Sequence, residues 1–278
     1  MSTAFARFIA AAIALLSIVA APARAQSGDA TPPTERLVDL PLANGHHQHA
    51  LLVVPPQPKA VIIMLPGGAG DVGLTLNGDI RHDTNFVIRT RKLWIARGYA
   101  VLIPDTIDRA NLRGLRSSSR YERVIGRLVT FADDAVAAPV FLLGTSQGAI
   151  AAMNGAARAP QGSLAGLILT EAVSVQGGSH ETVFDAAPED VRIPALVVAN
   201  RDDKCRVAPP DMASKIAAAM RKSPDVKVIT VSGGTVQSAR DCDSLSPHGY
   251  YGIEDRVVGV ISDWIEGHLA AQAKPPRG

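Results

Sequence analysis

The sequence lacks several features that would place it in particular classes of protein. It contains no internal repeat, no low-complexity segment and no shift in composition along the chain, so neither a repeat protein nor a second large domain is indicated. An excess of one charge is also lacking, because 28 lysines and arginines face 26 aspartates and glutamates. A chain this close to neutral gives no basis for binding nucleic acid or an anionic membrane.

The chain also lacks a hydrophobic run long enough for a membrane anchor. Arg7 precedes an apolar run from Phe8 to about Ala21, which is shorter than the roughly 20 residues that cross a bilayer. Ala23 and Ala25 follow it as small residues on either side of Arg24, which is the layout of a cleavable signal peptide. We therefore expect residues 1–25 to be removed, leaving no stable membrane anchor; an uncleaved anchor is the alternative. The mature protein is then exported, either periplasmic or secreted.

Cysteine is scarce, with only Cys205 and Cys242 in 278 residues. An export signal implies an oxidising compartment, where such a pair can persist as a disulfide. Two buried free thiols are the alternative. We predict a bridge between the two cysteines, which would tie together the loops that carry them.

The pattern of apolar runs predicts one α/β domain over residues 35–272. Residues 26–34 are polar and contain proline, which indicates a flexible N-terminus, and residues 273–278 are expected to form a disordered tail. Two strands, 36–42 and 46–55, flank Asn44-Gly45, a strong hairpin signal. After them, short runs of Val, Ile and Leu alternate with helical stretches, as in a parallel sheet covered on both faces. The count is about eight strands, mostly parallel, with no insertion large enough for a cap domain.

The segment Gly144-Thr145-Ser146-Gln147-Gly148 has the spacing of a nucleophile elbow. It follows the apolar run 139–144 and precedes a helix of small residues, 149–159. The residues flanking a serine on such a strained turn must be tiny, and both are glycine. A glycine-rich turn with an ordinary serine is the alternative reading.

A serine hydroxyl needs a base oriented by a carboxylate. Two later loops could supply them: Asp202 and Asp203 follow the strand 193–200, and His248 lies in a loop after the strand 226–231. The order Ser, Asp, His along the chain is that of an α/β-hydrolase triad.

Four motifs together resemble the α/β-hydrolase superfamily: the elbow GTSQG, the acid loop NRDDKC, the base loop SPHGYYGIE and the early LPGGAG. Within it, the chain is similar to exported bacterial serine hydrolases of the dienelactone-hydrolase or esterase type with a cysteine just after the acid. The resemblance covers nearly all of the mature chain and implies the α/β-hydrolase fold. The family's spacing favours Asp203 over Asp202 as the acid. Glu171, which follows the strand 164–170, ranks third, because some members of the superfamily place the acid after that strand.

The resemblance also implies where the oxyanion hole lies. Its two backbone donors would be the N–H groups of Gln147, just after the nucleophile, and of Gly68, with Ala69 as the alternative. The loop that carries Gly68 resembles the family's His-Gly-Gly loop, with Pro66 in place of the histidine.

The other six histidines are less suited to the role of base. His46, His47 and His49 crowd the expected hairpin, and with no carboxylate or cysteine in the same stretch they indicate a polar surface rather than a metal site. His82, in a loop after the strand 60–66, could line the pocket. His180 precedes the acid and His268 lies on the last helix, so neither follows the last strand as the family's base does.

We therefore predict a serine hydrolase that cleaves an ester or related acyl bond of a small-molecule substrate, with no metal or organic cofactor. The alternatives are a peptidase, an acyltransferase or a lyase that uses the same residues, or a binding protein without turnover. The loops 71–84 and 171–190 are expected to shape the pocket. Arg89 and Arg109 are candidate contacts for an anionic substrate group.

Overall fold

The computed structural model describes residues 31–42 and 45–272. Residues 1–30, 43–44 and 273–278 are outside the described residues. The predicted signal peptide, most of the predicted flexible N-terminus, Asn44 of the expected turn and the predicted tail therefore lie outside them. From Pro32 onward the chain forms one unit. No helix within the described residues is both long and apolar enough to cross a membrane.

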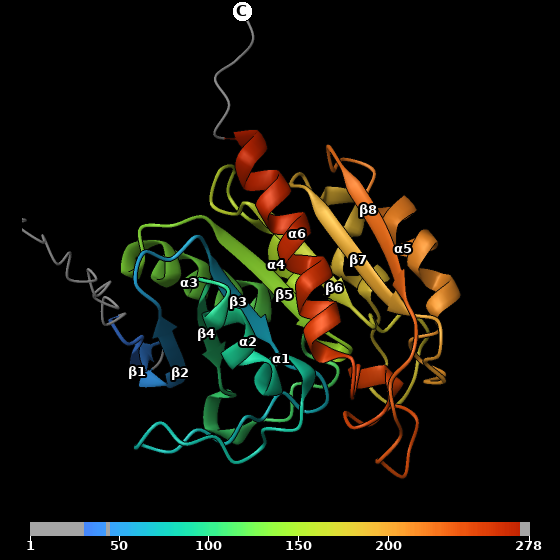
Figure 1. Ribbon diagram of the computed structural model, residues 1–278, viewed down its shortest axis with the longest axis horizontal. Coiled ribbons are helices and arrows are strands. Elements are labelled where there is room, and N and C mark those ends of the chain that lie inside the picture. Colours follow the sequence, from blue (N-terminus) through green and yellow to red (C-terminus); the bar gives the residue numbers. More distant parts are fainter. Residues whose placement is uncertain (1–30, 43–44, 273–278) are drawn as a thin grey trace, which may run out of the picture. The chain divides into compact units, whose positions relative to one another are not determined.

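An eight-stranded sheet forms the centre of the fold, in the order β1-β2-β4-β3-β5-β6-β7-β8 (Figure 1). β1 and β2 pair antiparallel, as the hairpin signal predicted, and β2 is antiparallel to β4. Every pairing from β4 to β8 is parallel, which confirms the mostly parallel sheet. The strands are β1 (Thr34–Pro41), β2 (His47–Val54), β3 (Val61–Leu65), β4 (Ala100–Pro104), β5 (Val140–Thr145), β6 (Gly166–Thr170), β7 (Ala195–Asn200) and β8 (Val226–Val231).

Helices cover both faces of the sheet, which is why its five central strands are apolar without a break. All residues of β3, β4, β5, β6 and β7 are buried, whereas the edge strand β8 is mostly part-exposed. Alternate residues of a strand point to opposite faces; thus Ile63 packs in the core with α3, α4 and α5, and Ile62 in the core with α1, α2 and α6. The helices are α1 (Phe86–Arg89), α2 (Arg91–Ala96), α3 (Ser119–Ala135), α4 (Gln147–Arg158), α5 (Ala213–Ala219) and α6 (Glu254–Gln272).

The helical stretch between β3 and β4, residues 86–96, is two short helices that meet at Thr90. The hydroxyl and the backbone N–H of Thr90 both donate to the carbonyl of Phe86, at 2.8 and 3.0 Å, and a threonine that bonds back in this way often bends a helix. No cap domain lies between β6 and β7 in the described chain, where the regular elements are two 3-10 turns, η3 (Val183–Ala186) and η4 (Pro188–Asp190).

Parallel strands end at one edge of the sheet, so the loops that follow them meet there. β3, β5, β6, β7 and β8 each lead into a loop with a candidate site residue or its neighbour. The fold thus explains why motifs far apart in the sequence converge.

Candidate active site

Ser146 occupies the sharp turn between β5 and α4. Its backbone lies at φ 53° and ψ −120°, a region that residues other than glycine rarely adopt. A Cβ on Gly144 would lie 2.3 Å from the Gly148 carbonyl oxygen, and one on Gly148 would lie 2.0 Å from the Leu65 carbonyl oxygen. Both glycines are therefore required by close backbone approach, as the sequence pattern indicated.

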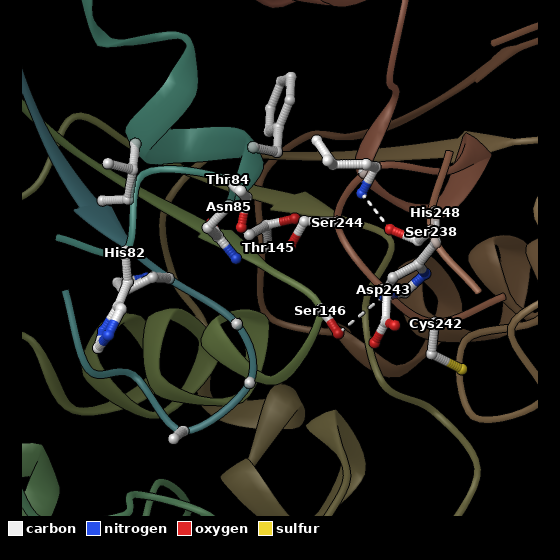
Figure 2. A pocket seen from close by; sticks show the side chains of 18 of the residues that line it. His82, Thr84, Asn85, Thr145, Ser146, Ser238, Cys242, Asp243, Ser244 and His248 are labelled. Atoms are coloured by element: carbon white, nitrogen blue, oxygen red, sulfur yellow. Dashed lines mark hydrogen bonds between the residues drawn. The ribbon is translucent and has the colours of Figure 1, made fainter. Parts of the chain in front are cut away.

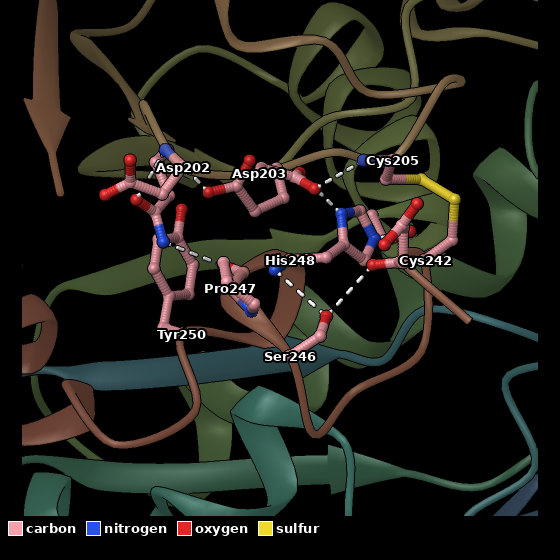
Figure 3. Close-up of polar contacts among 12 residues, drawn as sticks. Asp202, Asp203, Cys205, Cys242, Ser246, Pro247, His248 and Tyr250 are labelled. Carbon is pink, nitrogen blue, oxygen red and sulfur yellow. Dashed lines mark hydrogen bonds and ion pairs between the residues drawn. A yellow bond between two sulfur atoms is a disulfide. The ribbon is translucent and has the colours of Figure 1, made fainter. Parts of the chain in front are cut away.

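The structure brings the three predicted triad residues together (Figures 2 and 3). The Nε2 atom of His248 lies 2.9 Å from the Ser146 hydroxyl oxygen, and its Nδ1 atom lies 2.7 Å from Oδ2 of Asp203. Asp203 and His248 are 6% and 3% exposed. A hydroxyl, an imidazole and a carboxylate in this relay can activate the hydroxyl as a nucleophile.

The geometry favours Asp203 over its neighbour Asp202. Asp203 uses Oδ1 to accept the N–H of Cys205 at 2.7 Å, which leaves Oδ2 to the imidazole. Asp202 is exposed and accepts the N–H of Gly233, after β8, at 2.5 Å (Figure 3). Two adjacent acids thus have different tasks: one orients the histidine and the other joins two loops.

His248 lies in a short 3-10 turn, η6 (Pro247–Gly249), that several contacts hold in place. The Ser246 hydroxyl accepts the His248 N–H at 3.2 Å at the start of the turn. A Cβ on Gly249 would lie 1.9 Å from the Ser244 carbonyl oxygen, so only glycine fits there. The imidazole therefore projects from a turn whose backbone is fixed on both sides.

Neither arginine suggested as an anion contact serves the pocket. Arg89 pairs through Nε with Glu254 at 2.9 Å and donates through Nη2 to the Gly249 carbonyl at 2.8 Å. It therefore braces the turn that carries the histidine. Arg109, in the 3-10 turn η2 (Ile107–Arg109), is exposed and does not line the pocket that contains Ser146.

Glu171, the third candidate acid, is also at the site but does not contact the histidine within hydrogen-bond distance. It directly follows β6, is 2% exposed and has a positive φ of 43°. Burial, the nearby Asp203 charge and hydrogen bonding to that carboxyl raise the pKa of Glu171 well above its ordinary value.

The two cysteines form a disulfide, which confirms the predicted pairing (Figure 3). It joins the acid loop to the long segment between β8 and η6, across 37 residues of sequence. The backbone N–H of Cys205 also donates to the carboxylate of Asp203. The bridge therefore fixes a residue that contacts the predicted acid directly.

Solved structures with this architecture are numerous, although no family model and no curated protein matches the sequence. A dienelactone hydrolase from Anabaena variabilis matches at a TM-score of 0.60 and 15% identity, over 85% of this chain and 99% of its own. Est1E from Butyrivibrio proteoclasticus, solved with ferulic acid bound, matches at 0.58 and 14%, over 84% and 99%. An esterase from Rhizomucor miehei matches at 0.62 and 13%, over 89% and 86%. The chain has the α/β-hydrolase fold.

In this α/β-hydrolase fold the predicted oxyanion donors lie beside Ser146. Gln147 is the first residue of α4, where backbone N–H groups have no partner inside the helix. Gly67 abuts the nucleophile, since a Cβ there would lie 3.0 Å from Cβ of Ser146. Gly68, with φ 59°, and Ala69 follow it along the pocket wall. The donor roles of Gly68 and Gln147 stay predictions.

A buried arginine that the motifs did not indicate contacts the glycine-rich loop 66–70. Arg116 is 1% exposed, and its Nη2 atom donates to the Pro66 carbonyl at 3.3 Å. A Cβ on Gly70 would lie 2.9 Å from the same atom. Burial lowers the pKa of Arg116 to about 10, so it is charged at neutral pH. Within the described part of the chain it forms no ion pair, and its Nη1 atom has no hydrogen-bond partner.

The pocket over Ser146 has a volume of about 470 Å³ and is lined mainly by polar and glycine residues. The loop 71–84 forms part of it, as predicted, and His82 is among its lining residues (Figure 2). The prediction for the loop 171–190 is wrong, because none of its residues lines this pocket. Its 3-10 turn η3 packs Val183 and Ala186 into the core instead. Another wall comes from the segment 238–245, which the disulfide links through Cys242 to the loop that carries Asp203.

The histidines of the hairpin have carboxylate neighbours, contrary to expectation. His47 lies 2.8 Å from Asp39 and His49 lies 3.7 Å from it, because the antiparallel register sets Asp39 opposite His49. His46 lies 2.8 Å from Asp108. All five side chains are substantially exposed, so they form a polar surface on the first two strands and the nearby turn η2 (Ile107–Arg109).

Among the described residues, one group of candidate metal ligands has atoms close enough to share an ion: Glu171, Asp203 and His248. Both ring nitrogens of that histidine already face protein partners, the carboxylate and the serine hydroxyl. Two of the three members, Asp203 and His248, are thus engaged in the relay. His180 is exposed and His268 contacts Asp225 at 3.2 Å, so neither competes for the role of base.

Proposed function

We propose that this chain is a serine hydrolase that cleaves an ester or related acyl bond through an acyl-enzyme intermediate. The observation that carries the proposal is the continuous relay from the Ser146 hydroxyl to the His248 imidazole at 2.9 Å and from the imidazole to Asp203 at 2.7 Å. Its position at the strand-to-helix turn of an α/β-hydrolase fold supports the same reaction.

In the first half-reaction, Ser146 Oγ attacks the carbonyl carbon of the substrate while His248 Nε2 takes the hydroxyl proton. Asp203 holds the imidazole through Nδ1–H and stabilises the imidazolium that forms. The tetrahedral oxyanion accepts hydrogen bonds from the backbone N–H groups of Gln147 and Gly68. The proton on Nε2 then passes to the leaving alcohol, and the C–O bond to that alcohol breaks.

In the second half-reaction, a water molecule takes the place of the alcohol. His248 removes one of its protons as the water oxygen attacks the acyl carbon, and the same proton returns to Ser146 as the ester bond to the enzyme breaks. The products are a carboxylic acid and the free serine. No step requires a group other than the side chains, the two backbone donors and water.

The pocket favours a small, polar acyl substrate over a long lipid chain. Its walls are rich in glycine, serine and charged residues, and its volume of about 470 Å³ suits a small molecule. The Anabaena variabilis neighbour is named for a dienelactone and Est1E was solved with ferulic acid, both compact molecules.

A fluorophosphonate probe tests the nucleophile directly, because it reacts covalently with an activated serine. We expect the wild type to be labelled and Ser146→Ala to be silent. Ser174→Ala is the matched control, since Ser174 is a buried serine that does not line the pocket; it should be labelled like the wild type. Absence of labelling in the folded wild type would contradict the proposal and favour a binding protein.

A substrate panel separates the reaction types that the same residues could perform. We expect p-nitrophenyl esters of short acids to be hydrolysed faster than the matching anilides, with water preferred over added alcohols as the acyl acceptor. Faster anilide cleavage would indicate a peptidase, and alcohol transfer an acyltransferase. Product formation without either hydrolysis or transfer would indicate a lyase.

We also propose that the protein is exported and matures by cleavage after Ala25. The disulfide supports this, because such bonds persist in oxidising compartments. Intact-mass analysis of the protein recovered from its native host should give a chain that begins at Gln26, and cell fractionation should find it outside the cytoplasm.

A further inference from the structure

A second buried acid, Glu171, lies behind the proposed triad and has no role in the mechanism above. It follows β6 directly, next to β7, whose following loop carries Asp203. Its positive φ of 43° is a strained conformation for a glutamate, and it is 2% exposed. A charged residue type kept in a strained and buried position calls for a functional explanation.

The two carboxyl oxygens of Glu171 have different surroundings. Oε1 accepts the backbone N–H of Asn200 at 2.7 Å. Oε2 is buried and receives no hydrogen bond from any described residue. At the same time, one carboxyl oxygen of Glu171, one of Asp203 and one ring nitrogen of His248 all lie within 4.8 Å of one another. An oxygen without a donor beside another carboxylate is what a protonated acid requires, because its own O–H is the donor.

Among the described residues, no lysine or arginine forms an ion pair with Glu171. Asp203 faces it from the loop after β7, the Tyr250 hydroxyl faces it from the end of η6, and the backbone N–H of Asn200 faces it from β7. The His248 imidazole has a ring nitrogen within 4.8 Å of a Glu171 carboxyl oxygen, and its Nδ1 atom is engaged by Asp203. Two like charges at this separation in a buried site strongly oppose each other.

We propose that Glu171 is a positioning residue that stays a neutral carboxylic acid and donates a hydrogen bond from Oε2 to Asp203, so that the pair carries one negative charge behind His248. The proposal deepens the function above and rests on it. Asp203 then receives three donors: the Cys205 N–H on Oδ1, the His248 N–H on Oδ2, and the Glu171 O–H. A carboxylate has about four acceptor positions, so all three can be satisfied.

The raised pKa of Glu171 agrees with this assignment, because a neutral acid at physiological pH needs such a shift. Its proton does not take part in turnover: it stays on Oε2 while His248 carries the serine proton to the leaving group. The task of Glu171 is to fix the orientation of the Asp203 carboxylate and to keep a second negative charge away from the imidazole.

Glutamine is the variant that tests the protonation state. In Glu171→Gln the amide oxygen can still accept from Asn200, and the amide N–H₂ can donate to Asp203 as the acid O–H does. We expect Glu171→Ala to lower kcat about tenfold or more with little change in KM, and Glu171→Gln to restore kcat to within about threefold of the wild type. The acidic limb of the pH–rate profile should have the same midpoint in Glu171→Gln as in the wild type.

Glu181 provides a matched control, because it is a buried glutamate in the opposite situation. Its two oxygens accept three bonds, from the N–H groups of Gly114 and Ser117 and from the Ser117 hydroxyl. In a glutamine at this position, the amide N–H₂ group would face one or more of these donors and could not accept their hydrogen bonds. Glu181→Gln should therefore lower the melting temperature, and should leave the midpoint of the acidic limb in place.

Infrared difference spectroscopy reads the protonation state without relying on turnover. The spectrum of the wild type minus Glu171→Gln at neutral pH should contain the C=O band of a protonated carboxyl. An ionised carboxylate band in its place, or a shift of the acidic limb by about one pH unit or more in Glu171→Gln, would overturn the proposal. If the wild type is not labelled by the fluorophosphonate, the proposed function fails, whereas the infrared result still decides the state of Glu171.

Discussion

The two sides of the site are held by different kinds of interaction. On the acid side, defined here as Glu171, Asp203, His248 and the disulfide, side chains contact side chains at 2.7 Å or are joined covalently. On the oxyanion side, defined as the loop 66–70 with Gln147 and Arg116, the proposed functional groups are backbone N–H groups. They are held by glycine geometry and by one buried arginine.

The difference shows where each side is vulnerable. On the acid side, side-chain chemistry carries the function, so exchanging one atom of Asp203 changes the relay directly. On the oxyanion side, a mutation acts by moving the backbone, so its effect depends on how far the loop can relax. We therefore expect larger losses of activity from the acid side and smaller, more graded losses from the oxyanion side.

The largest effect should come from Asp203→Asn. An amide in place of the carboxylate can donate to the imidazole and favours the wrong tautomer, so kcat/KM should fall by up to about 10⁴-fold. Asp202→Asn is the control on the adjacent residue. Because Asp202 contacts Gly233 and not the histidine, its kcat/KM should stay within about threefold. Equal losses in the two variants would mean that the acid has been assigned wrongly.

Removal of the disulfide should have the next largest effect. The double variant Cys205→Ser, Cys242→Ser opens a loop of 37 residues, which in the chain-entropy model lowers the free energy of unfolding by about 3 to 4 kcal/mol. Activity should fall as well, since the bridge holds both the Asp203 loop and a wall of the pocket. Urea unfolding measures the first effect and kcat/KM the second. Unchanged values of both would exclude a role of the bridge in the site.

On the oxyanion side, Arg116→Met should separate activity from stability. The variant loses the bond to the Pro66 carbonyl, so the loop can shift and kcat should fall about 10- to 100-fold, less than removal of a whole oxyanion donor. Stability should be nearly unchanged or higher, because burying a charge without an ion-pair partner is unfavourable. Arg120→Met, on the exposed start of α3, should alter neither. A parallel loss of stability and activity in Arg116→Met would indicate a purely structural role.

The smallest effect, taken per pH unit, is a pH dependence of stability from Glu171. In the unfolded chain the acid ionises near its ordinary pKa of 4.5, while the folded value is well above this. The folded state therefore binds more protons over that window, and stability falls as pH rises, by at most about 1.4 kcal/mol per pH unit. Glu171→Gln removes this slope. Its melting temperature relative to the wild type should increase between about pH 5 and about pH 8, and a constant difference would argue against a neutral Glu171.

Much of the fold could be predicted from the sequence because the central strands are apolar without interruption. A strand such as Ala195–Asn200, buried on both faces, has few alternatives to a parallel sheet with helices on each side. The break at Thr90 could not be predicted in the same way. Threonine occurs both inside and at the ends of helices, so the residue type alone does not show that its hydroxyl will bond back to Phe86.

The site was predictable where motifs carry it and unpredictable where folding brings unrelated residues together. Ser146 and His248 follow from their spacing, and Gly144 and Gly148 from steric necessity at the turn. Arg116 belongs to no motif and contacts the loop 66–70 only because the fold brings the connection after β4 next to it. The wall 238–245 is another such case, since its position depends on the bridge between two loops.

The sequence by itself determined the class of fold, and it predicted the turn that carries Ser146, the histidine that meets it and the pairing of the two cysteines. These features depend on residue type and local spacing, which the linear chain displays. Only the tertiary structure decided which of two adjacent aspartates faces the imidazole, which loop forms the second pocket wall, and that a second acid lies behind the first. The physical reason is that hydrogen-bond partners and burial depend on the distance between atoms in space, and residues such as Glu171 and Asp203 become neighbours only when β6 and β7 pair.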